Sequence, residues 1–363
     1  MKRILCIISS LNAGGAETFL MKVARVANPD EYQLDFVVSE EGGIYTDEVL
    51  SRGGRIFYVP TRHESLIKAL CGIKKIVKEN NYSNVLKLGN RPNSVLDLVA
   101  AKLGGASNLA MRSCNALTGL SKIQKCEDAI FRVLLNRITN LKLAPSELAA
   151  IYTFGRKQVV KGNTTIIHNA VDCSVFHYIE EDREKVRQSL KIPLNALVVG
   201  HVGRFSKQKN HEFLLRTFKE ILNRHDTAFL LLVGEGELET KIRKLAAELN
   251  IENRIVFAGL RRDIPAILSS MDVFVFPSYY EGMPNTVIEA QATGLPCLIS
   301  DSITSEANIT GLVKYLPLTL DASMWAEKVD SLIQQKREST REQFVQSGYE
   351  INAVSRKFFN MFL

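Results

Sequence analysis

Short apolar runs alternate with amphipathic stretches along the whole chain, and this alternation constrains the fold more than any other feature. Runs rich in apolar and β-branched residues are separated by stretches with helical spacing in the first half, and the second half repeats the scheme. Strands that alternate with helices predict parallel sheets covered by helices on both faces, so we expect an α/β protein with doubly wound, Rossmann-like sheets. The candidate strands are Arg3–Ser9, Gln33–Ser39, Arg55–Val59, Asn84–Leu88, Asn108–Arg112, Thr165–His168, Ala196–Val202, Ala228–Val233, Arg254–Ala258, Asp272–Pro277 and Pro296–Ile299.

The length of the chain indicates two such sheets. Its 363 residues exceed one ordinary core and fit two domains of roughly 150–200 residues each. We expect Rossmann-like domains over residues 1–173 and 196–345, facing an interdomain cleft and joined by a charge-rich linker over 174–195 that has room for one short helix. The apolar end of the chain, 346–363, is expected to pack as a helix back across the domains.

Composition excludes several classes of protein. Charged residues make up 23% of the chain and hydrophobic residues 46%, which is typical of a globular protein and not of a disordered one. No apolar run approaches the ~20 residues of a membrane-spanning helix. The six cysteines include no C-x-x-C pair, so we expect reduced thiols in a cytoplasmic protein rather than disulfides or a zinc site.

The excess of positive charge lies in the first half. Residues 1–170 carry 23 Lys and Arg against 14 Asp and Glu, whereas residues 171–363 carry 23 against 25. Two stretches, 65–79 and 121–137, are both amphipathic and basic. They predict either peripheral contact with an anionic membrane or helices that pack on the core and expose a solvated basic face. Nucleic acid is not expected as a partner, because no recognition motif is present.

The most informative motif is PSYYEGMPNTVIEAQATG, from Pro277 to Gly294. A buried strand ends at Pro277, a loop follows, and Pro284 and Gly294 mark the two ends of a helix. The start of such a helix lies where open α/β sheets bind ligands, and its backbone N–H groups favour a phosphate. Glu281 and Glu289 flank this start, and two carboxylates suit the hydroxyls of a sugar and a ribose on either side of a diphosphate. The alternative is a surface glutamate and a first-turn glutamate stabilised by the helix dipole.

Two cations follow the first strand of the second half. The stretch Gly203-Arg-Phe-Ser-Lys-Gln-Lys-Asn210 predicts that Arg204 and Lys209 lie in the same crevice as this helix start. Fixed cations there would neutralise a leaving diphosphate without a metal ion. No D-x-D pair occurs in the chain, so we expect neither a metal nor another cofactor. The alternative is a charged surface turn.

A glycine-rich turn follows the first strand of the chain. The stretch Leu11-Asn-Ala-Gly-Gly-Ala-Glu17 would let the backbone at Gly15 approach a phosphate closely. Such turns also occur purely for packing.

Taken together, the motifs resemble those of retaining glycosyltransferases with the GT-B fold, specifically glycosyltransferase family 4 and its bacterial exopolysaccharide and capsule enzymes. The resemblance covers nearly the whole chain. It rests on the glycine-rich turn, on stretches 168–172, 200–205 and 232–237, and most specifically on the E-x7-E pattern from Glu281 to Glu289. It implies a retaining, metal-independent hexosyltransferase that passes a sugar from a nucleotide diphosphate donor, expected to be a UDP-sugar, to a saccharide or lipid-linked saccharide. Such an enzyme would work in the cytoplasm or at the inner face of the cell membrane.

The resemblance also implies roles for individual residues. Glu281 would contact the donor sugar near the reacting carbon, and Glu289 would hold the ribose hydroxyls. Arg204 and Lys209 would bind the diphosphate and stabilise its charge as it leaves. The other donor contacts would come from Gly15, Gly234, Glu235, Gly282, Met283, Pro284, Asn285 and Thr286.

The acceptor side departs from the family pattern. Many relatives carry a histidine after the fourth or fifth strand, whereas this chain has none in residues 85–90 or 110–115. His201 lies in a strand-like run and is expected in the core. The candidates to replace the histidine are Lys87, Asn90, Arg112 and Asn115.

Two alternatives remain at this point. Without that histidine, the chain fits a weakly catalytic or non-catalytic nucleotide-sugar-binding subunit that supports a partner enzyme. A nucleotide-sugar epimerase or a phosphorylase shares the fold, although a phosphorylase would need a longer chain and a pyridoxal-bearing lysine.

Overall fold

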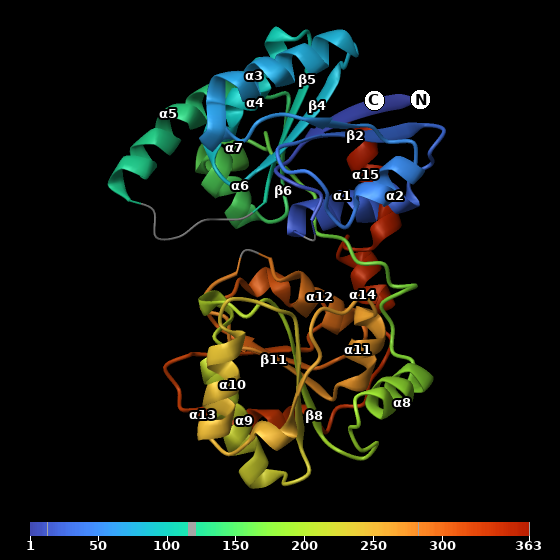
Figure 1. The fold of residues 1–363 in the computed structure, drawn as a ribbon, viewed down its shortest axis with the longest axis vertical. Helices are drawn as coiled ribbons and strands as arrows, with labels where there is room; N and C mark the ends of the chain where they lie inside the picture. The colour runs from blue at the N-terminus through green and yellow to red at the C-terminus, as the bar shows by residue number, and fades with distance from the viewer. Residues whose placement is uncertain (13, 115–120, 282, 363) are drawn as a thin grey trace. The chain divides into compact units, whose positions relative to one another are not determined.

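The computed structural model describes residues 1–12, 14–114, 121–281 and 283–362, which form two compact units (Figure 1). The first unit comprises the described residues of 1–170 together with 351–362. The second unit comprises the described residues of 171–350. Each unit contains one parallel sheet with helices on both faces, as the alternation of strands and helices predicts.

In the described part of the first unit, the sheet has seven strands in the order β3-β2-β1-β4-β5-β6-β7, all parallel. The strands are β1 (Lys2–Ile7), β2 (Tyr32–Val38), β3 (Ile56–Tyr58), β4 (Asn84–Gly89), β5 (Asn108–Ser113), β6 (Leu141–Ala144) and β7 (Thr165–Ile166). The helices are α1 (Gly15–Val26), α2 (Thr46–Ser51), α3 (Arg62–Glu79), η1 (Pro92–Ser94), α4 (Val95–Leu103), α5 (Lys122–Ile138), α6 (Glu147–Phe154), α7 (Arg156–Val160) and α15 (Ile351–Asn360).

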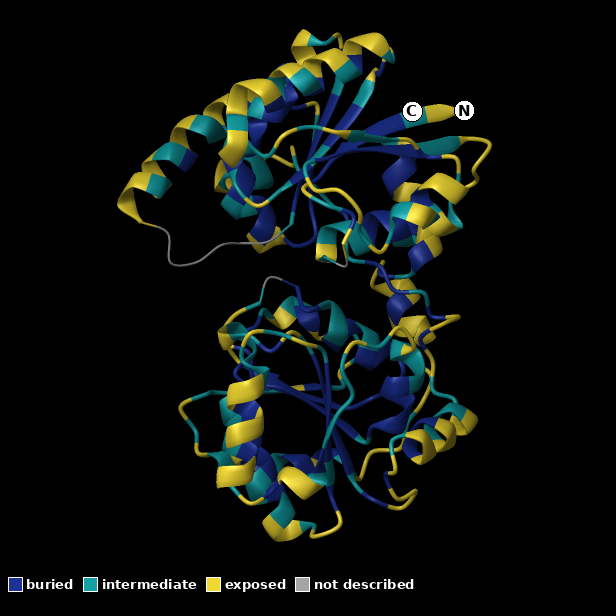
Figure 2. Ribbon diagram, in the orientation of Figure 1, coloured by how far each residue is buried: buried dark blue, intermediate teal, exposed yellow. Residues whose placement is uncertain are grey.

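Alternate residues of β1 enter the two cores on either side of this sheet. Ile4 and Cys6 pack with α1 and α15, whereas Leu5 and Ile7 pack with α3, α4 and α6. A strand whose two faces are both covered must be apolar where it is covered, and the strands in the middle of each sheet are accordingly mostly dark blue in Figure 2.

In the described part of the second unit, the sheet has six parallel strands in the order β10-β9-β8-β11-β12-β13. The strands are β8 (Val198–Val202), β9 (Phe229–Val233), β10 (Ile255–Phe257), β11 (Val273–Phe276), β12 (Cys297–Ser300) and β13 (Val313–Leu316). The helices are α8 (Glu180–Ser189), η2 (Lys207–Lys209), α9 (His211–Arg224), α10 (Glu239–Glu248), η3 (Glu252–Arg254), α11 (Ile264–Ser270), α12 (Asn285–Ala292), η4 (Ser305–Ala307), α13 (Ala322–Leu332) and α14 (Arg341–Gln346). The core on one face of the sheet includes α11 and α12, and the core on the other includes α9, α10 and α13.

Residues 174–195, expected to be a linker, lie within the second unit. They include α8, which is anchored by the fully buried side chain of Arg187. Its guanidinium pairs with Asp272 at 2.8 Å and donates to the carbonyls of Ser270 at 2.9 Å and Ala196 at 2.8 Å. These contacts make the segment an integral part of the unit.

The end of the chain completes the core of the first unit. Phe358 of α15 is fully buried, and its ring centroid lies 5.6 Å from that of Phe19 in α1. Ser355 Oγ, also in α15, donates a hydrogen bond to the carbonyl of Val23 in α1 at 2.9 Å. The segment 346–363, expected to form one helix, is therefore divided: residues 346–350 lie in the second unit, and α15 lies in the first. No helix in the described ranges is both long and apolar enough to span a bilayer.

Candidate functional site

Two predicted residues meet at the carboxyl edge of the second sheet. Lys209 follows β8 and Glu281 follows β11, and these strands are neighbours. Lys209 Nζ lies 2.7 Å from Glu281 Oε1 and 4.5 Å from the ring centroid of Phe276. The two charged side chains are only 17% and 10% exposed. Partial burial lowers the effective dielectric around the pair, so its charges interact more strongly than exposed charges would.

The backbone around this pair is clamped by Gln208. Its carbonyl accepts a hydrogen bond from the Tyr279 backbone N–H at 2.9 Å, and its side-chain Nε2 donates to the Tyr280 carbonyl at 2.8 Å. The residues that precede Lys209 and Glu281 are thus bonded to each other. Both charged groups are therefore held in place by their loops as well as by their mutual attraction.

The second predicted cation, Arg204, lies apart from this pair. Its guanidinium is 3.2 Å from the Glu237 carboxylate, and the two side chains are 73% and 55% exposed. Exposed pairs of this kind contribute little to stability and separate easily. Arg204 is thus an exposed surface cation, whereas Lys209 is largely buried.

Gly234 and Glu235 join two neighbouring loops of the second unit. Gly234 has a φ of +133°, and a Cβ atom there would lie 2.3 Å from the Gly203 carbonyl oxygen. The Glu235 carbonyl accepts a hydrogen bond from the Phe205 N–H at 3.0 Å. The loops after β8 and β9 therefore pack backbone to backbone, which only a glycine at position 234 permits.

The start of α12 provides the predicted anion-binding feature. Pro284 is its N-cap residue and carries no hydrogen-bonding side chain, so it offers no acceptor to the first N–H groups of the helix. Met283 and Pro284 are buried, whereas Asn285, Thr286 and Glu289 are half-buried. Gly282 lies outside the described residues.

Two buried histidines lie next to the Lys209 loop. His201 Nδ1 donates to the Val275 carbonyl at 2.9 Å, and its ring centroid lies 4.7 Å from that of His211. Burial lowers the pKa of His201 well below its ordinary value, with His211 as a further cause, and burial lowers the pKa of His211 to about 4. Both rings are therefore neutral near pH 7 and belong to the core.

In the first unit, the glycine-rich turn is covered by Glu17. A Cβ atom on Gly14 would lie only 2.2 Å from Glu17 Oε2, so the carboxylate folds back over the turn. The pKa of Glu17 is raised above its ordinary value, mainly by burial. The charge of Glu40 also raises this pKa, and the charge of the nearby Lys87 opposes the shift. Gly15, the predicted contact, is the exposed first residue of α1. Glu17 belongs to the glycine-rich motif, but the sequence alone does not single it out.

A pocket of about 270 Å³ lies at the carboxyl edge of the first sheet. Its charged wall holds Lys87 and Arg62, whose nitrogens lie 2.9 Å and 2.7 Å from the two carboxylate oxygens of Asp97. Burial acts to raise the pKa of Asp97, but the charges of Lys87 and Arg62 outweigh it and hold this pKa below its ordinary value. A wall of hydrogen-bonding groups facing apolar side chains is typical of a small-molecule site. The apolar wall consists of Ile7, Val37, Val59, Ala69 and Ile73.

The other acceptor-side candidates lie in different surroundings. Arg112 is 1% exposed, with its guanidinium 3.7 Å from the Phe19 ring centroid and 2.7 Å from Asn169 Oδ1. Burial lowers the pKa of Arg112 to about 10. It therefore belongs to the core and does not face a ligand. Asn90 is exposed after β4, and Asn115 lies outside the described residues.

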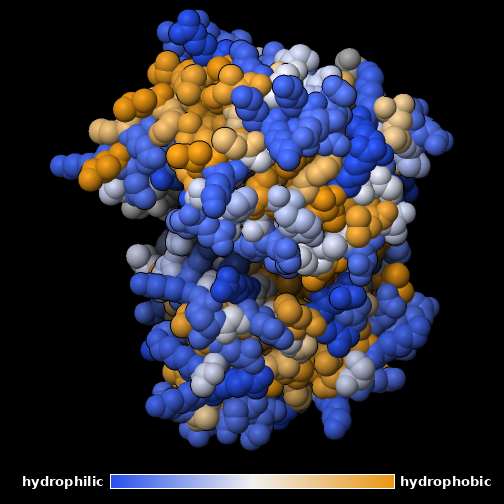
Figure 3. Space-filling model, turned by 45° about the horizontal axis from the view of Figure 1, so that its top comes forward, coloured by the Kyte–Doolittle hydropathy of each residue, from blue (hydrophilic) through white to orange (hydrophobic). Residues whose placement is uncertain are grey.

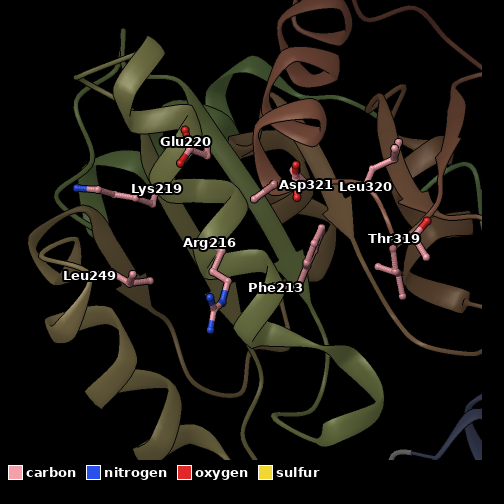
Figure 4. A pocket seen from close by; sticks show the side chains of 10 residues that line it. Phe213, Arg216, Lys219, Glu220, Leu249, Thr319, Leu320 and Asp321 are labelled. Carbon is pink, nitrogen blue, oxygen red and sulfur yellow. The ribbon is translucent and has the colours of Figure 1, made fainter.

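A second pocket, of about 480 Å³, lies between α9 and the loop before α13 (Figure 4). Figure 4 shows Arg216 and Lys219 pointing in different directions, and none of the predicted site residues lines the pocket. It lacks the convergent polar groups of a ligand site. The part of the chain that the structure describes also contains no cluster of three His, Cys, Asp or Glu side chains that could hold a metal ion.

Comparison with known proteins gives a consistent result. The family model described as "Glycosyl transferases group 1" matches residues 182–351, a range that includes Lys209 and Glu281. EpsF of Bacillus subtilis (strain 168), a protein described as a glycosyltransferase, is 32% identical over 357 residues, which are 96% of this chain and 93% of EpsF. The UDP-Gal:alpha-D-GlcNAc-diphosphoundecaprenol alpha-1,3-galactosyltransferase of Escherichia coli is 28% identical over 287 residues, covering 75% of this chain and 72% of that enzyme.

Solved structures agree on the fold. The crystal structure of Anabaena Alr3699/HepE in complex with UDP-glucose matches with a TM-score of 0.78 at 19% identity, over 100% of this chain and 99% of that one. With the two parallel sheets, this likeness shows the GT-B fold.

Proposed function

The chain belongs to the group 1 glycosyltransferases, and we propose that it transfers a hexose from a UDP-sugar to a saccharide or lipid-linked saccharide acceptor. The names of its relatives support this choice of substrates. The E. coli relative is named for UDP-Gal and a diphosphoundecaprenol-linked GlcNAc, and HepE was crystallised with UDP-glucose. The product would be part of a cell-surface polysaccharide, such as a capsule or exopolysaccharide.

The observation that carries the proposal is the pairing of Lys209 with Glu281 just before α12. The Lys209 ammonium has three hydrogens to donate, so it can hold Glu281 and bind a phosphate oxygen at the same time. The donor diphosphate would lie at the start of α12, where the backbone N–H groups and the helix dipole favour an anion. As the bond between sugar and phosphate breaks, Lys209 would stabilise the charge that develops on the leaving diphosphate, without a metal ion.

The other predicted donor contacts are proposed around this centre. Glu281 would accept hydrogen bonds from the donor sugar near the reacting carbon, and Glu289 would hold the ribose. Arg204 would leave Glu237 to reach the diphosphate, which its exposed position permits. Backbone and side chains at residues 283–286 would contact the sugar and diphosphate, and Gly234 and Glu235 would lie near the base or ribose. Retention of the anomeric configuration is proposed from the E-x7-E resemblance and would be read from the product by NMR.

We assign the acceptor to the pocket of the first unit. Arg62, Lys87 and Asp97 offer donors and acceptors for saccharide hydroxyls, and the apolar wall suits the face of a sugar ring. Glu17 is a half-buried carboxylate close to Lys87 and is a candidate to orient the acceptor hydroxyl. An enzyme with a lipid-linked acceptor would work at the inner face of the cell membrane.

Thermal-shift measurements against nucleoside diphosphates and their sugars, with and without Mg²⁺, test the donor site. A ligand that binds only the folded protein raises the melting temperature. We expect a metal-independent shift that is selective for UDP and a UDP-sugar and is reduced in Glu289→Ala. No shift from any nucleotide with well-folded protein would contradict the proposal.

A transfer assay then separates an enzyme from a binding subunit. We expect Glu281→Ala to lose transfer while keeping the UDP shift. Donor binding by the wild-type protein without transfer to any saccharide acceptor would favour the non-catalytic subunit instead.

A further inference from the structure

The face of α5 that points away from the sheet is more apolar than a solvated helix requires. Ile123, Ile130 and Val133 on this face are 82%, 71% and 70% exposed. Cys126 and Leu134 lie beside them, and the five positions fall within about 100° of the helix circumference. We call these five residues the outer face of α5.

The same helix already buries a second apolar face. Leu135 is fully buried in the core of the first unit, and Phe131 and Ile138 pack against that core. An ordinary amphipathic helix would expose only polar residues opposite this face. The outer face of α5 therefore lies outside the core of the first unit.

The charges around the outer face are positive. Both carboxylates of the helix pair with Arg91, whose Nη2 lies 2.7 Å from Glu127 and 2.9 Å from Asp128, so a cation offsets part of their charge. The cations Lys122 and Lys125, in contrast, are exposed at the start of the helix. The apolar stripe is thus bordered by positive charge.

Figure 3 shows the resulting surface. Orange apolar side chains gather on the first unit, at the upper left of the view, over α5 and the helices next to it, with blue hydrophilic side chains around them. Contiguous exposed apolar patches with a polar rim mark interaction sites on soluble domains.

We propose that the outer face of α5 docks this protein on an anionic lipid surface. An exposed apolar stripe bordered by lysines is the pattern of helices that lie in the membrane interface, where apolar side chains enter the headgroup region and cations meet anionic lipids. The charge favours an anionic membrane over an uncharged partner. The inference deepens the proposed function, because a lipid-linked acceptor would lie in that membrane, but it is measured without donor or acceptor.

Vesicle sedimentation of the full chain tests the docking surface. The probes are vesicles of phosphatidylcholine alone and vesicles of equal parts phosphatidylcholine and phosphatidylglycerol. We expect binding to the anionic vesicles only, weakened by added salt because screening reduces the attraction between charges. The triple variant Ile123→Ser, Ile130→Ser, Val133→Ser loses three inserted side chains. Its affinity for the anionic vesicles should therefore fall by a factor of about ten or more.

Matched variants in the second unit serve as controls. Leu260→Ser, Met324→Ser, Val345→Ser also removes three exposed apolar side chains, and it should bind like the wild type. We expect the double variant Lys122→Glu, Lys125→Glu to abolish binding. The double variant Lys185→Glu, Lys314→Glu makes the same change of charge at exposed positions of the second unit, and it should bind like the wild type. Circular dichroism and the unfolding curve of each variant show that it is folded, and neither measurement depends on the donor site.

Three outcomes would overturn the proposal. The first is wild-type protein that does not sediment with anionic vesicles. The second is equal binding by the α5 variants and their matched controls. The third is a wild-type dimer that the triple variant converts to a monomer, because the outer face would then be covered by a second copy of the chain.

Discussion

At the scale of single residues, the proposed donor site depends on one fixed ammonium group. Lys209 is 17% exposed and paired with Glu281, whereas Arg204 is 73% exposed and paired with a surface glutamate. A preorganised charge contributes more to a transition state than one that must first be ordered.

We therefore expect Lys209→Met to lower kcat by about 10²–10³, the usual cost of removing one preorganised stabilising group. Steady-state transfer kinetics measure the change. Arg204→Met is the matched control and should lose much less. Equal losses in the two variants would contradict the different placement of the two cations.

The buried histidines make the second unit sensitive to acid. Burial lowers the pKa of His211 to about 4, so the unfolded chain binds a proton on this ring at a higher pH than the folded protein does. The stabilisation is fully present above the ordinary histidine pKa and is lost as the pH falls toward 4. Between pH 7 and pH 5, His211 alone should remove about 2 kcal/mol from the free energy of unfolding.

Urea unfolding at pH 5, 6 and 7 tests this pH dependence. His211→Phe keeps an aromatic ring next to Phe205, whose centroid lies 4.4 Å from that of His211, and removes the proton site. The fall in the free energy of unfolding between pH 7 and pH 5 should be smaller in His211→Phe than in the wild type. An unchanged dependence would show that the acid sensitivity has another source.

The meeting of Lys209 and Glu281 could be predicted from the order of the strands, whereas their roles in binding and catalysis stay predictions. Lys209 and Glu281 each follow a predicted strand, and the carboxyl ends of neighbouring parallel strands lie together. Sequence reasoning did not find the Arg62–Asp97 pair, because this contact depends on how α3 packs against α4. The burial of Arg112 was equally hidden, since an arginine at a strand end is usually exposed.

At the scale of elements, the contact between the loops after β8 and β9 depends on one glycine. Gly234→Ala would place a Cβ atom 2.3 Å from the Gly203 carbonyl oxygen at a φ of +133°. We expect a loss of about 2–4 kcal/mol in stability, together with weaker UDP binding, because the Lys209 loop would shift.

Gly259→Ala is the control for this change. Its φ is +63°, and the atom nearest to an added Cβ would be 3.8 Å away, so only the backbone strain of about 1 kcal/mol applies. Chemical denaturation and the UDP thermal shift measure both variants. Similar losses of stability in the two would argue against the clash.

Elements with a strong apolar pattern were predicted, and short mixed ones were not. Strands such as Phe229–Val233 are apolar throughout and stand out in the sequence. The strands Leu141–Ala144 and Val313–Leu316 are only four residues long and contain a lysine, so their pattern is too short to recognise. Helix α8 is the short helix expected within the charge-rich linker. Its packing on the second unit was not predicted, because it depends on the buried side chains of Val186 and Arg187, which do not stand out in that segment.

At the scale of the whole molecule, the two units have separate cores, and only the first includes the end of the chain. Phe358→Ala should cost the first unit about 3–5 kcal/mol, because it leaves a cavity next to Phe19. Scanning calorimetry measures the two units separately when UDP is added to mark the second one. The melting temperature of the first unit should be lower in the variant, and that of the UDP-sensitive second unit should be unchanged. A uniform shift of both transitions would mean that the units unfold together.

The division of the chain also sets an order of events on the ribosome. The strands of the first unit emerge early, but α15, which covers Phe19 and Val23, follows 180 residues of the second unit. At about 5–20 residues per second, the apolar surface that α15 covers waits roughly 10–40 s for it. A chain cut short between β13 and α15 would keep this surface exposed, although it contains every strand of the two sheets in the described residues. The first unit is therefore complete only after the whole second unit has been made, and chaperones or proteases that bind exposed apolar surface can distinguish chains that carry α15 from chains that lack it.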